Sequence, residues 1–392
     1  MKVLIINKFA QVTGGADRHA LDVIRLLREQ GHAVQLLSTA NPQNLERVGQ
    51  FVEPSVTSAS RYGLSVKARA SAARRALWNR EAARATSEIF ATFQPDIVHT
   101  HKLYPQLSVA PVVIAKRHGV PVVQTIHDYE FISANPLNST ACALDRQEET
   151  VAFRALNTAT FAVRRYVHRP RVTTWIAVSE AVATIHREHG IEPVIIRNFV
   201  VSDRAEVPTR VQREGVLYVG RLTAEKGSDV IIEAARLLPN VRFTVAGMGP
   251  DAPLIEAAAR ELPNLVFLGR VAPTEVASLL RAAVMSLMPS RWQEPGPLTA
   301  LEAMCAGTPI VAFDSGGLAE YVRRADAGIV VENTAAALVD GCRTLLESQT
   351  AWQRASDGGR AGVASSFSAE RYAHEIVDVY EGALRACEGR AE

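Results

Sequence analysis

Apolar residues follow two alternating patterns from the first residues of the chain. Residues 3–6 form a continuous apolar run, which is typical of a strand buried on both faces of a parallel sheet. A second such run follows at 33–37. Between the two runs, apolar residues recur at helical spacing, at Ala20, Val23, Ile24 and Leu27. The order strand, helix, strand predicts the opening of a Rossmann-like domain.

The same alternation begins again in the second half. Residues 203–212 are polar and contain a proline, so they are predicted to be a linker. An apolar run at 216–220 then predicts a new first strand, and a helix with apolar residues on one face follows it. We therefore predict an α/β protein with two Rossmann-like domains, at 1–205 and 206–365, and a final helical segment at 366–392.

The first loop of the first domain contains Gly14 and Gly15. It lacks the three spaced glycines of the dinucleotide-binding pattern, so NAD binding is not indicated. The glycines can let backbone approach a ligand, or they can form a turn without any ligand.

The most informative stretch covers residues 289–312. It reads as strand end, loop, helix, turn and strand, with Glu294 before the helix and Glu302 inside it. A glycine-containing loop followed by the free N–H groups of a helix start makes an anion site. Two carboxylates beside an anion site suit a nucleotide sugar, which has phosphates at one end and hydroxyls elsewhere. The alternative is a pair of surface carboxylates near a helix N-terminus.

The pattern of Glu294, seven residues and Glu302 resembles the signature of family 4 retaining glycosyltransferases. The resemblance implies the GT-B architecture, in which two Rossmann-like domains with parallel sheets face each other across a cleft. The final helix would cross back to the first domain. In this family the first Glu contacts hydroxyls of the donor sugar, and the second holds the ribose. Here Pro297 has no N–H to offer a phosphate, so Gly296 and Leu298 are expected to make the phosphate contacts.

Arg221 and Lys226 follow the first strand of the second domain and also match the family, where they neutralise the diphosphate. Two cations near a helix N-terminus repel unless an anion lies between them, which favours a ligand there. The resemblance places Gly247 at the donor and Val271 in the loop that meets its base. Gly14 and Gly15 would approach the donor diphosphate or the acceptor.

In the first domain, two predicted strands end in histidines. We expect His99 in the core and His101 at the cleft, because ligands gather at the carboxyl ends of such strands. His127 and Asp128 resemble the family's Thr-x-His-Asp loop beside the transferred sugar. The expected acceptor side is therefore His101 with Asp128. Alternatively, His127 only caps its strand.

The resemblance also implies a mechanism. The sugar would be transferred with retention, with His127 and Glu294 positioning it and with Arg221 and Lys226 stabilising the diphosphate. No Asp-x-Asp sequence occurs in the chain, so we expect no metal and no cofactor. Within enzymes, a GT-B epimerase or phosphorylase is an alternative. A catalytically silent nucleotide-sugar-binding subunit is an alternative of another class.

Charge is divided unevenly between the halves. Residues 1–205 contain 25 lysines and arginines against 17 acidic residues, and residues 206–392 contain 18 against 24. Helical stretches at 61–93 and 154–171 hold much of the basic excess. This predicts either a solvated surface or contact with an anionic membrane or acceptor. The acceptor itself is left open: a lipid-linked glycan, a polysaccharide precursor or a small molecule. No aromatic-basic motif indicates nucleic acid.

The remaining features concern cell location. The four cysteines are scattered without paired spacing, which favours a reducing cytosol over a disulfide framework. The first apolar run stops after four residues at Asn7 and is expected to be a strand, not a signal peptide. We therefore expect a cytoplasmic enzyme, which would be peripheral on the inner face of the membrane if its basic first domain contacts lipid.

Overall fold

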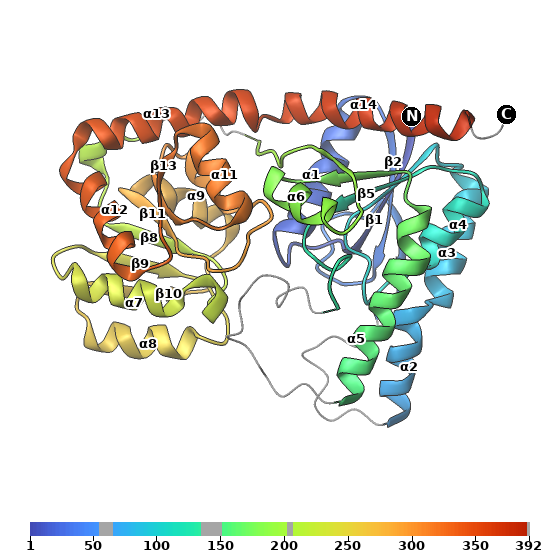
Figure 1. The fold of residues 1–392 in the computed structure, drawn as a ribbon, viewed down its shortest axis with the longest axis horizontal. Helices are drawn as coiled ribbons and strands as arrows, with labels where there is room; N and C mark the ends of the chain where they lie inside the picture. Colours follow the sequence, from blue (N-terminus) through green and yellow to red (C-terminus); the bar gives the residue numbers. More distant parts are fainter. Residues whose placement is uncertain (55–65, 135–150, 202–206, 390–392) are drawn as a thin grey trace.

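The computed structural model describes residues 1–54, 66–134, 151–201 and 207–389. Within these residues the chain forms two open sheets with helices packed around each (Figure 1). All strand pairs in both sheets are parallel. The predicted α/β architecture with two parallel sheets is confirmed.

The first sheet has seven strands in the order β3-β2-β1-β4-β5-β6-β7. Its strands are β1 (Lys2–Phe9), β2 (Ala33–Thr39), β3 (Gly49–Val52), β4 (Ile97–Thr100), β5 (Val122–Ile126), β6 (Thr174–Ala177) and β7 (Pro193–Ile195). The helices of this domain are α1 (Gly15–Glu29), α2 (Val66–Leu77), α3 (Arg80–Thr92), α4 (Ala110–Arg117), α5 (Val151–Val163), the π-helical turn η2 (Arg164–His168), the 3-10 turn η3 (Arg169–Arg171) and α6 (Glu180–Arg187).

The second sheet has six strands in the order β10-β9-β8-β11-β12-β13. Its strands are β8 (Val216–Val219), β9 (Phe243–Ala246), β10 (Leu265–Gly269), β11 (Met285–Met288), β12 (Ile310–Phe313) and β13 (Gly328–Val331). Its helices are η4 (Arg210–Gln212), η5 (Ala224–Lys226), α7 (Ser228–Leu237), α8 (Ala252–Glu261), α9 (Pro273–Ala282), α10 (Leu298–Cys305), α11 (Gly316–Ala325), α12 (Ala335–Glu347) and α13 (Gln349–Ser366).

The first apolar run is buried on both faces of its sheet, as predicted. Val3 and Ile5 pack with α1 on one face, and Leu4 and Ile6 pack with α3 and α4 on the other. All four side chains are fully buried. Successive side chains of a strand point to opposite faces, so a continuous apolar run fits a strand covered on both sides.

The last helix, α14 (Ala369–Glu388), belongs to the core of the first domain. Its side chains Tyr372, Ile376 and Tyr380 are fully buried in the hydrophobic cluster that also contains Val3 and Ile5 of β1. Figure 1 shows α13 along the second domain and α14 continuing along the first. The chain therefore returns to its first sheet after it has completed the second.

The predicted long helix at 61–93 is two helices, so this prediction was wrong. The break follows Trp78, where Asn79 caps α3 by accepting hydrogen bonds from the amides of Glu81 and Ala82. Asparagine is a strong N-cap residue, and it competes with continuation of the preceding helix. Residues 61–65 lie outside the described part of the chain.

The second predicted basic helix also differs from the expectation. The segment passes from α5 through a π turn to a 3-10 turn, and the π turn buries Arg164 and His168. These two side chains therefore do not contribute to a basic surface. The short strand β3 was not predicted from the sequence.

Candidate active site between the two sheets

Each sheet reverses its strand order at one point, between β1 and β4 in the first sheet and between β8 and β11 in the second. Ligands of open parallel sheets bind outside the carboxyl ends of the strands at such a point. The loops at these ends contact each other across the domains. The hydroxyl of Tyr129, which follows β5, donates a hydrogen bond of 3.0 Å to the carbonyl of Gln293, which follows β11. We call the region formed by these loops the interdomain site.

The second sheet brings Lys226 and Glu294 together. Lys226 ends η5 after β8, and Glu294 lies in the loop between β11 and α10. The ammonium of Lys226 donates a hydrogen bond to Oε1 of Glu294 and lies 5.3 Å from the centroid of the Trp292 ring. Glu294 is only 6% exposed, so the carboxylate depends on this cation to offset its loss of water.

Arg221 has a different partner. Its Nη2 lies 3.5 Å from Oε1 of Glu225, and its side chain is 58% exposed. Each predicted phosphate-binding cation thus has a carboxylate beside it. The expectation that Arg221 and Lys226 need an anion between them was incomplete, because it left out Glu225 and Glu294. Arg221 still presents most of its side chain to solvent.

Glu302 lies on α10, and its carboxylate is 4.0 Å from the guanidinium of Arg18 on α1. Burial raises the pKa of the Glu302 carboxyl, Arg18 partly offsets this rise, and Asp22 adds to it. The two helices therefore meet across the domain boundary, with one carboxylate near one guanidinium.

The start of α1 faces the start of α10. Gly14 is the N-cap residue of α1, and a Cβ added there would meet nothing within 4 Å. A Cβ added at Gly15 would lie 3.9 Å from Cγ of Leu298, the first residue of α10. Pro297 is the N-cap residue of α10 and does not itself begin the helix. The first amides of both helices have no partner within their helix, which leaves donors on both sides of the interdomain site.

Two predicted donor-binding glycines are required by packing. A Cβ at Gly296 would lie 2.6 Å from Oη of Tyr321. Gly247 has φ +156°, and its Cβ would lie 1.8 Å from the carbonyl oxygen of Gly220. The N–H of Gly247 bonds to the carbonyl of Gly269, two residues before the half-buried Val271. These contacts explain the glycines without a ligand.

Four histidines gather at the carboxyl edge of the first sheet. Nδ1 of His101 lies 3.0 Å from Nε2 of His127, and the ring of His19 lies 5.3 Å from that of His127. His99 lies 4.3 Å from His101, ring to ring. His99 is in the core as predicted, and His101 is also fully buried, so it lies behind His127 at the carboxyl edge of the sheet.

Burial keeps these imidazoles neutral. It lowers the pKa of His19 and of His99 to about 3. Burial, and then the nearby rings, hold the pKa of His101 and His127 well below the ordinary value. A neutral imidazole has one donor and one acceptor nitrogen, so His127 can orient a hydroxyl group without carrying charge.

Asp128 is bound by Lys102, a residue that the sequence did not single out. The ammonium of Lys102 donates to Oδ2 of Asp128 and lies 3.4 Å from Oε1 of Glu130. Burial opposes the charge of Lys102, but Asp128 and then Glu130 raise its pKa. Asp128 is therefore half of an ion pair and has less freedom to accept a ligand hydroxyl than the sequence suggested.

Sequence reasoning missed several residues of this region. Glu225 and Lys102 pair with the predicted residues Arg221 and Asp128, and Glu130 pairs with Lys102. Tyr372 and Tyr380 of α14 approach the histidines. Nε2 of His19 lies 3.1 Å from Oη of Tyr372, and Nδ1 of His99 lies 2.7 Å from Oη of Tyr380. Only the alternation of apolar and aromatic residues at the end of the chain hinted that these tyrosines are buried.

The domains are also joined beside the predicted loop. The hydroxyl of Tyr321 donates to the carbonyl of Val178 at 2.6 Å and accepts from the amide of Asn198 at 3.1 Å. The amide side chain of Asn198 donates to the carbonyl of Gly296 at 2.7 Å. Nε of Arg197 lies 2.7 Å from Oε1 of Glu320. These bonds fix the loop after β11 against the first domain.

Within the part of the chain that the structure describes, no group of three or more histidine, cysteine, aspartate or glutamate side chains is arranged to hold a metal ion. The same residues contain no helix that is both long and apolar enough to cross a bilayer.

Comparison with known families covers nearly the whole chain. Residues 13–204 match the model of "Glycosyltransferase Family 4", and residues 202–361 match that of "Glycosyl transferases group 1". The two matches meet at the predicted linker. They also separate the domain that carries His127 from the domain that carries Lys226 and Glu294.

Curated relatives agree with this assignment. The chain is 30% identical to a glycogen synthase of Mycobacterium tuberculosis over 75% of this chain and 70% of that protein. It is 27% identical to a phosphatidyl-myo-inositol mannosyltransferase of the same organism, over 94% of this chain and 93% of that protein.

A solved structure shows the same fold. The Anabaena protein HepE, in complex with UDP-glucose, superposes with a TM-score of 0.69 at 17% identity, over 97% of this chain and 100% of that chain. The chain thus has the GT-B fold and belongs to glycosyltransferase family 4.

Proposed function

We propose that the chain transfers a sugar from a nucleotide diphosphate sugar to a hydroxyl acceptor, with retention of configuration and without a metal ion or other cofactor. The observation that carries this proposal is the pair of Lys226 and Glu294 at the carboxyl edge of the second sheet, next to the start of α10. The UDP-glucose complex of HepE, a protein of the same fold, supports a nucleotide sugar as donor.

Lys226 and Glu294 offer the two chemistries that such a donor needs. A diphosphate would attract the Lys226 ammonium, and the Glu294 carboxylate would then accept hydrogen bonds from sugar hydroxyls. Without a donor, Lys226 and Glu294 pair with each other. When the donor binds, Lys226 would contact the diphosphate and Glu294 the sugar hydroxyls. Arg221, being mostly exposed, adds a second cation, and Glu302 would hold the ribose.

The leaving nucleoside diphosphate gains negative charge as the glycosidic bond breaks. Arg221, Lys226 and the amides at the start of α10 would stabilise that charge, which is usually the largest single contribution to catalysis. These positive groups take the part that a metal ion plays in other transferases. Retention fits attack from the face of the leaving group, with a phosphate oxygen accepting the proton of the acceptor hydroxyl.

His127 would position the transferred sugar from the first domain. Its neutral imidazole suits a hydroxyl partner, and its ring is held by His101. The acceptor would approach beside Asp128, whose Oδ2 pairs with Lys102 and whose Oδ1 accepts from the amide of Glu130, so a hydroxyl would use a remaining lone pair of this carboxylate. We retain His127 and Asp128 as the first-domain side of the site, with His101 supporting His127 from behind.

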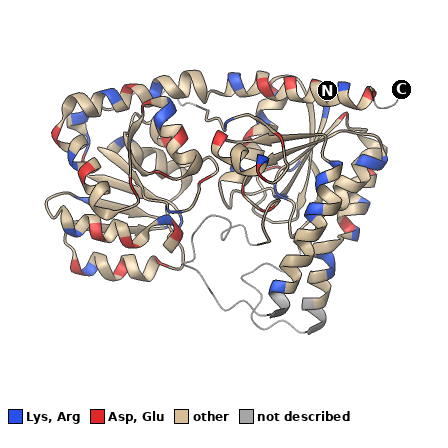
Figure 2. Cartoon of the chain, in the orientation of Figure 1, with Lys and Arg blue, Asp and Glu red and all other residues tan. Residues whose placement is uncertain are grey.

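We further propose that the enzyme acts in the cytoplasm and binds the inner face of the membrane through its first domain. Figure 2 shows basic residues along α2, α3 and α5. Part of this charge is paired, because Arg75 lies 2.9 Å from Glu81 and Arg84 lies 2.9 Å from Glu88. The exposed Arg74 and Arg80 have no described ion pair and are the better candidates for lipid contact.

The proposed reaction is tested by incubating the protein with UDP-, GDP- and dTDP-sugars and following each by mass spectrometry. Slow hydrolysis of one donor, abolished in Lys226→Ala, is expected. Conversion of a donor into an isomer without any acceptor would instead indicate an epimerase. Tight donor binding with no turnover on any acceptor would indicate a silent binding subunit and contradict the proposal.

A further inference from the structure

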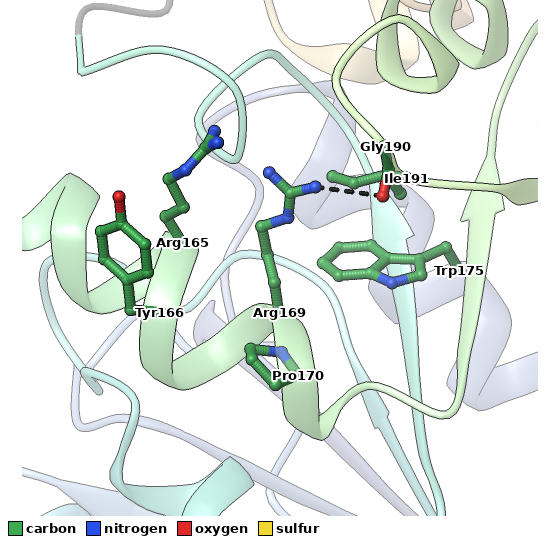
Figure 3. Close-up of a pocket in the computed structure, with 7 residues that line it drawn as sticks. All are labelled: Arg165, Tyr166, Arg169, Pro170, Trp175, Gly190 and Ile191. Atoms are coloured by element: carbon green, nitrogen blue, oxygen red, sulfur yellow. Dashed lines mark hydrogen bonds between the residues drawn. The ribbon is translucent and has the colours of Figure 1, made fainter.

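A cavity lies in the first domain, away from the interdomain site (Figure 3). Its volume is about 360 Å³, within the range of small-ligand pockets. One wall is Trp175, which stands at the start of β6, and another is Ile191, which lies just before β7. His127 follows the opposite, carboxyl end of β5, the strand paired with β6. The cavity therefore opens at the amino ends of the strands.

Two guanidinium groups stand at this cavity. Figure 3 shows the side chains of Arg165 and Arg169 extending in the same direction, with Arg169 beside the Trp175 ring. Nη2 of Arg169 donates to the carbonyls of His189 and Gly190, at 2.7 and 3.2 Å. Among the described residues, no carboxylate forms an ion pair with either arginine. Like charges four positions apart repel, so this arrangement favours an anion between them.

The local chain geometry orients both arginines outward. Arg164 is buried and donates to the carbonyl of Glu130 at 2.7 Å, and the buried His168 lies 3.1 Å from the hydroxyl of Tyr104. These contacts anchor one side of the π turn. Arg165 and Arg169 follow the anchored residues directly and so face the cavity. Single π turns of this kind are frequent at functional sites.

The other residues of the cavity indicate which groups a ligand would carry besides its anion. Trp175 is 8% exposed and presents ring surface, and Pro170 and Ile191 add apolar area. The hydroxyl of the exposed Tyr166 adds a donor and acceptor at the rim. Guanidinium groups recognise phosphate with two parallel hydrogen bonds.

We propose that Arg165 and Arg169 form a phosphate-binding site, separate from the donor site, for a phosphate ester whose apolar or ring-shaped part packs on Trp175. The same chemistry occurs in soluble sugar or glycerol phosphates and in lipid headgroups. The site does not depend on the proposed transfer reaction, and its test reads out binding alone.

The four tryptophans permit a direct test by ¹⁹F NMR of protein labelled with 5-fluorotryptophan. The Trp175 signal, assigned with Trp175→Phe, reports on the cavity. The Trp292 signal reports on the interdomain site, because Lys226 lies over its ring. Glycerol 3-phosphate is the soluble probe, glycerol is the uncharged control, and phosphatidylglycerol vesicles are the lipid probe.

We expect glycerol 3-phosphate to shift the Trp175 signal saturably and glycerol to leave it unchanged. Arg165→Gln should weaken this binding roughly tenfold or more, since a hydrogen bond to a charged group is lost. The affinity of Arg165→Lys should lie between those of the unmodified protein and Arg165→Gln, because lysine keeps the charge but lacks the planar guanidinium group. Arg154→Gln, an exposed change of the same charge on α5, should have no effect.

The Trp292 signal confirms folding in every variant and separates binding at the two sites. A Trp175 shift with glycerol 3-phosphate assigns soluble phosphate esters to the cavity, and a shift with vesicles alone assigns lipid headgroups. No Trp175 response to either probe would overturn the proposal. A response of equal strength in Arg165→Gln would also overturn it, because the arginine would then not be the recognition group.

Discussion

The carboxyl edges of the two sheets have the same strand order around their reversal points but present different chemistry. At the second edge, Lys226 and Arg221 reach solvent beside carboxylates. At the first edge, His99 and His101 are fully buried and neutral. Equivalent topology therefore fixes where a ligand binds, and the local side chains decide which part of the ligand each edge recognises.

This difference matches the two ends of a nucleotide sugar. The charged edge suits phosphates, whereas neutral imidazoles suit hydroxyl groups, which need direction but no compensation of charge. If the comparison is right, changes at the second edge should affect charge stabilisation, and changes at the first edge should affect stability and orientation. The following experiments test this division.

The largest effect is expected for Lys226→Ala. Loss of one electrostatic stabiliser should slow turnover by roughly 10²–10³. It also leaves Glu294 buried without its cation, so folding should be checked by circular dichroism. Arg236→Ala, an exposed change on α7 of the same domain, is the control. Near-normal turnover in Lys226→Ala would remove this lysine from the donor site.

Glu294→Ala and Glu302→Ala should distinguish recognition of the sugar from recognition of the nucleotide. Glu294→Ala frees Lys226, so free nucleoside diphosphate should bind at least as tightly while the intact donor binds roughly tenfold more weakly. Glu302→Ala should weaken both ligands. Isothermal titration with UDP, GDP and their sugars measures this, and equal weakening of the free nucleotide by both variants would contradict the division of roles.

Gly296→Ala should show how strictly the two edges are held together. The added Cβ would lie 2.6 Å from Oη of Tyr321, and such overpacking costs about 1–3 kcal/mol. Tyr321→Phe removes the hydroxyl that meets the Cβ and that bonds to Val178. The loss of unfolding free energy in the double variant, measured by urea denaturation, should therefore be smaller than the sum of the losses in the two single variants. Additive losses would show that Gly296 and Tyr321 act independently.

Stability should depend on pH through the first edge. His19 has a pKa of about 3 in the folded chain and an ordinary value of 6.5, so only the unfolded chain gains its proton between these values. The contribution of His19 to the free energy of unfolding is therefore fully present above pH 6.5, and it is lost as the pH falls towards 3. His19→Gln should reduce this slope by up to about 1.4 kcal/mol per pH unit, measured by urea denaturation. His374→Gln, on the exposed face of α14, is the control variant.

The smallest effect concerns membrane contact by the basic first domain. Arg74→Glu with Arg80→Glu should weaken co-sedimentation with phosphatidylglycerol vesicles by about 1 kcal/mol per residue. Binding should be lost at high salt. Arg343→Glu in the second domain is the matched control. Failure of the unmodified protein to sediment at low salt would move the acceptor assignment to a soluble molecule.

The sequence predicted the architecture and singled out candidate residues of the second edge because these signals are local. A strand buried on both faces must be continuously apolar, so each domain could be recognised from short runs such as residues 3–6. Glu294 and Glu302 lie in one continuous loop and helix, and their spacing is visible directly. The contact of Glu294 with Lys226 was not visible, because it depends on β8 and β11 becoming neighbours in the sheet.

The first edge was harder to predict for the same physical reason. His19, His101 and His127 follow different strands or lie on α1, and two hydroxyls that approach the histidines come from α14, at the other end of the chain. No local spacing connects them. His101 was expected at the cleft because it follows a strand, and its complete burial depends on packing from segments distant in sequence.

The return of α14 to the first sheet sets the order in which the chain can mature during synthesis. Until residues 369–388 have left the ribosome, the face of the first sheet that buries Tyr372, Ile376 and Tyr380 has no cover. The amino-terminal half emerges first but is completed last. A chain that stops before α14 would expose this apolar face in a nearly finished protein, and quality-control proteases and chaperones recognise such surfaces.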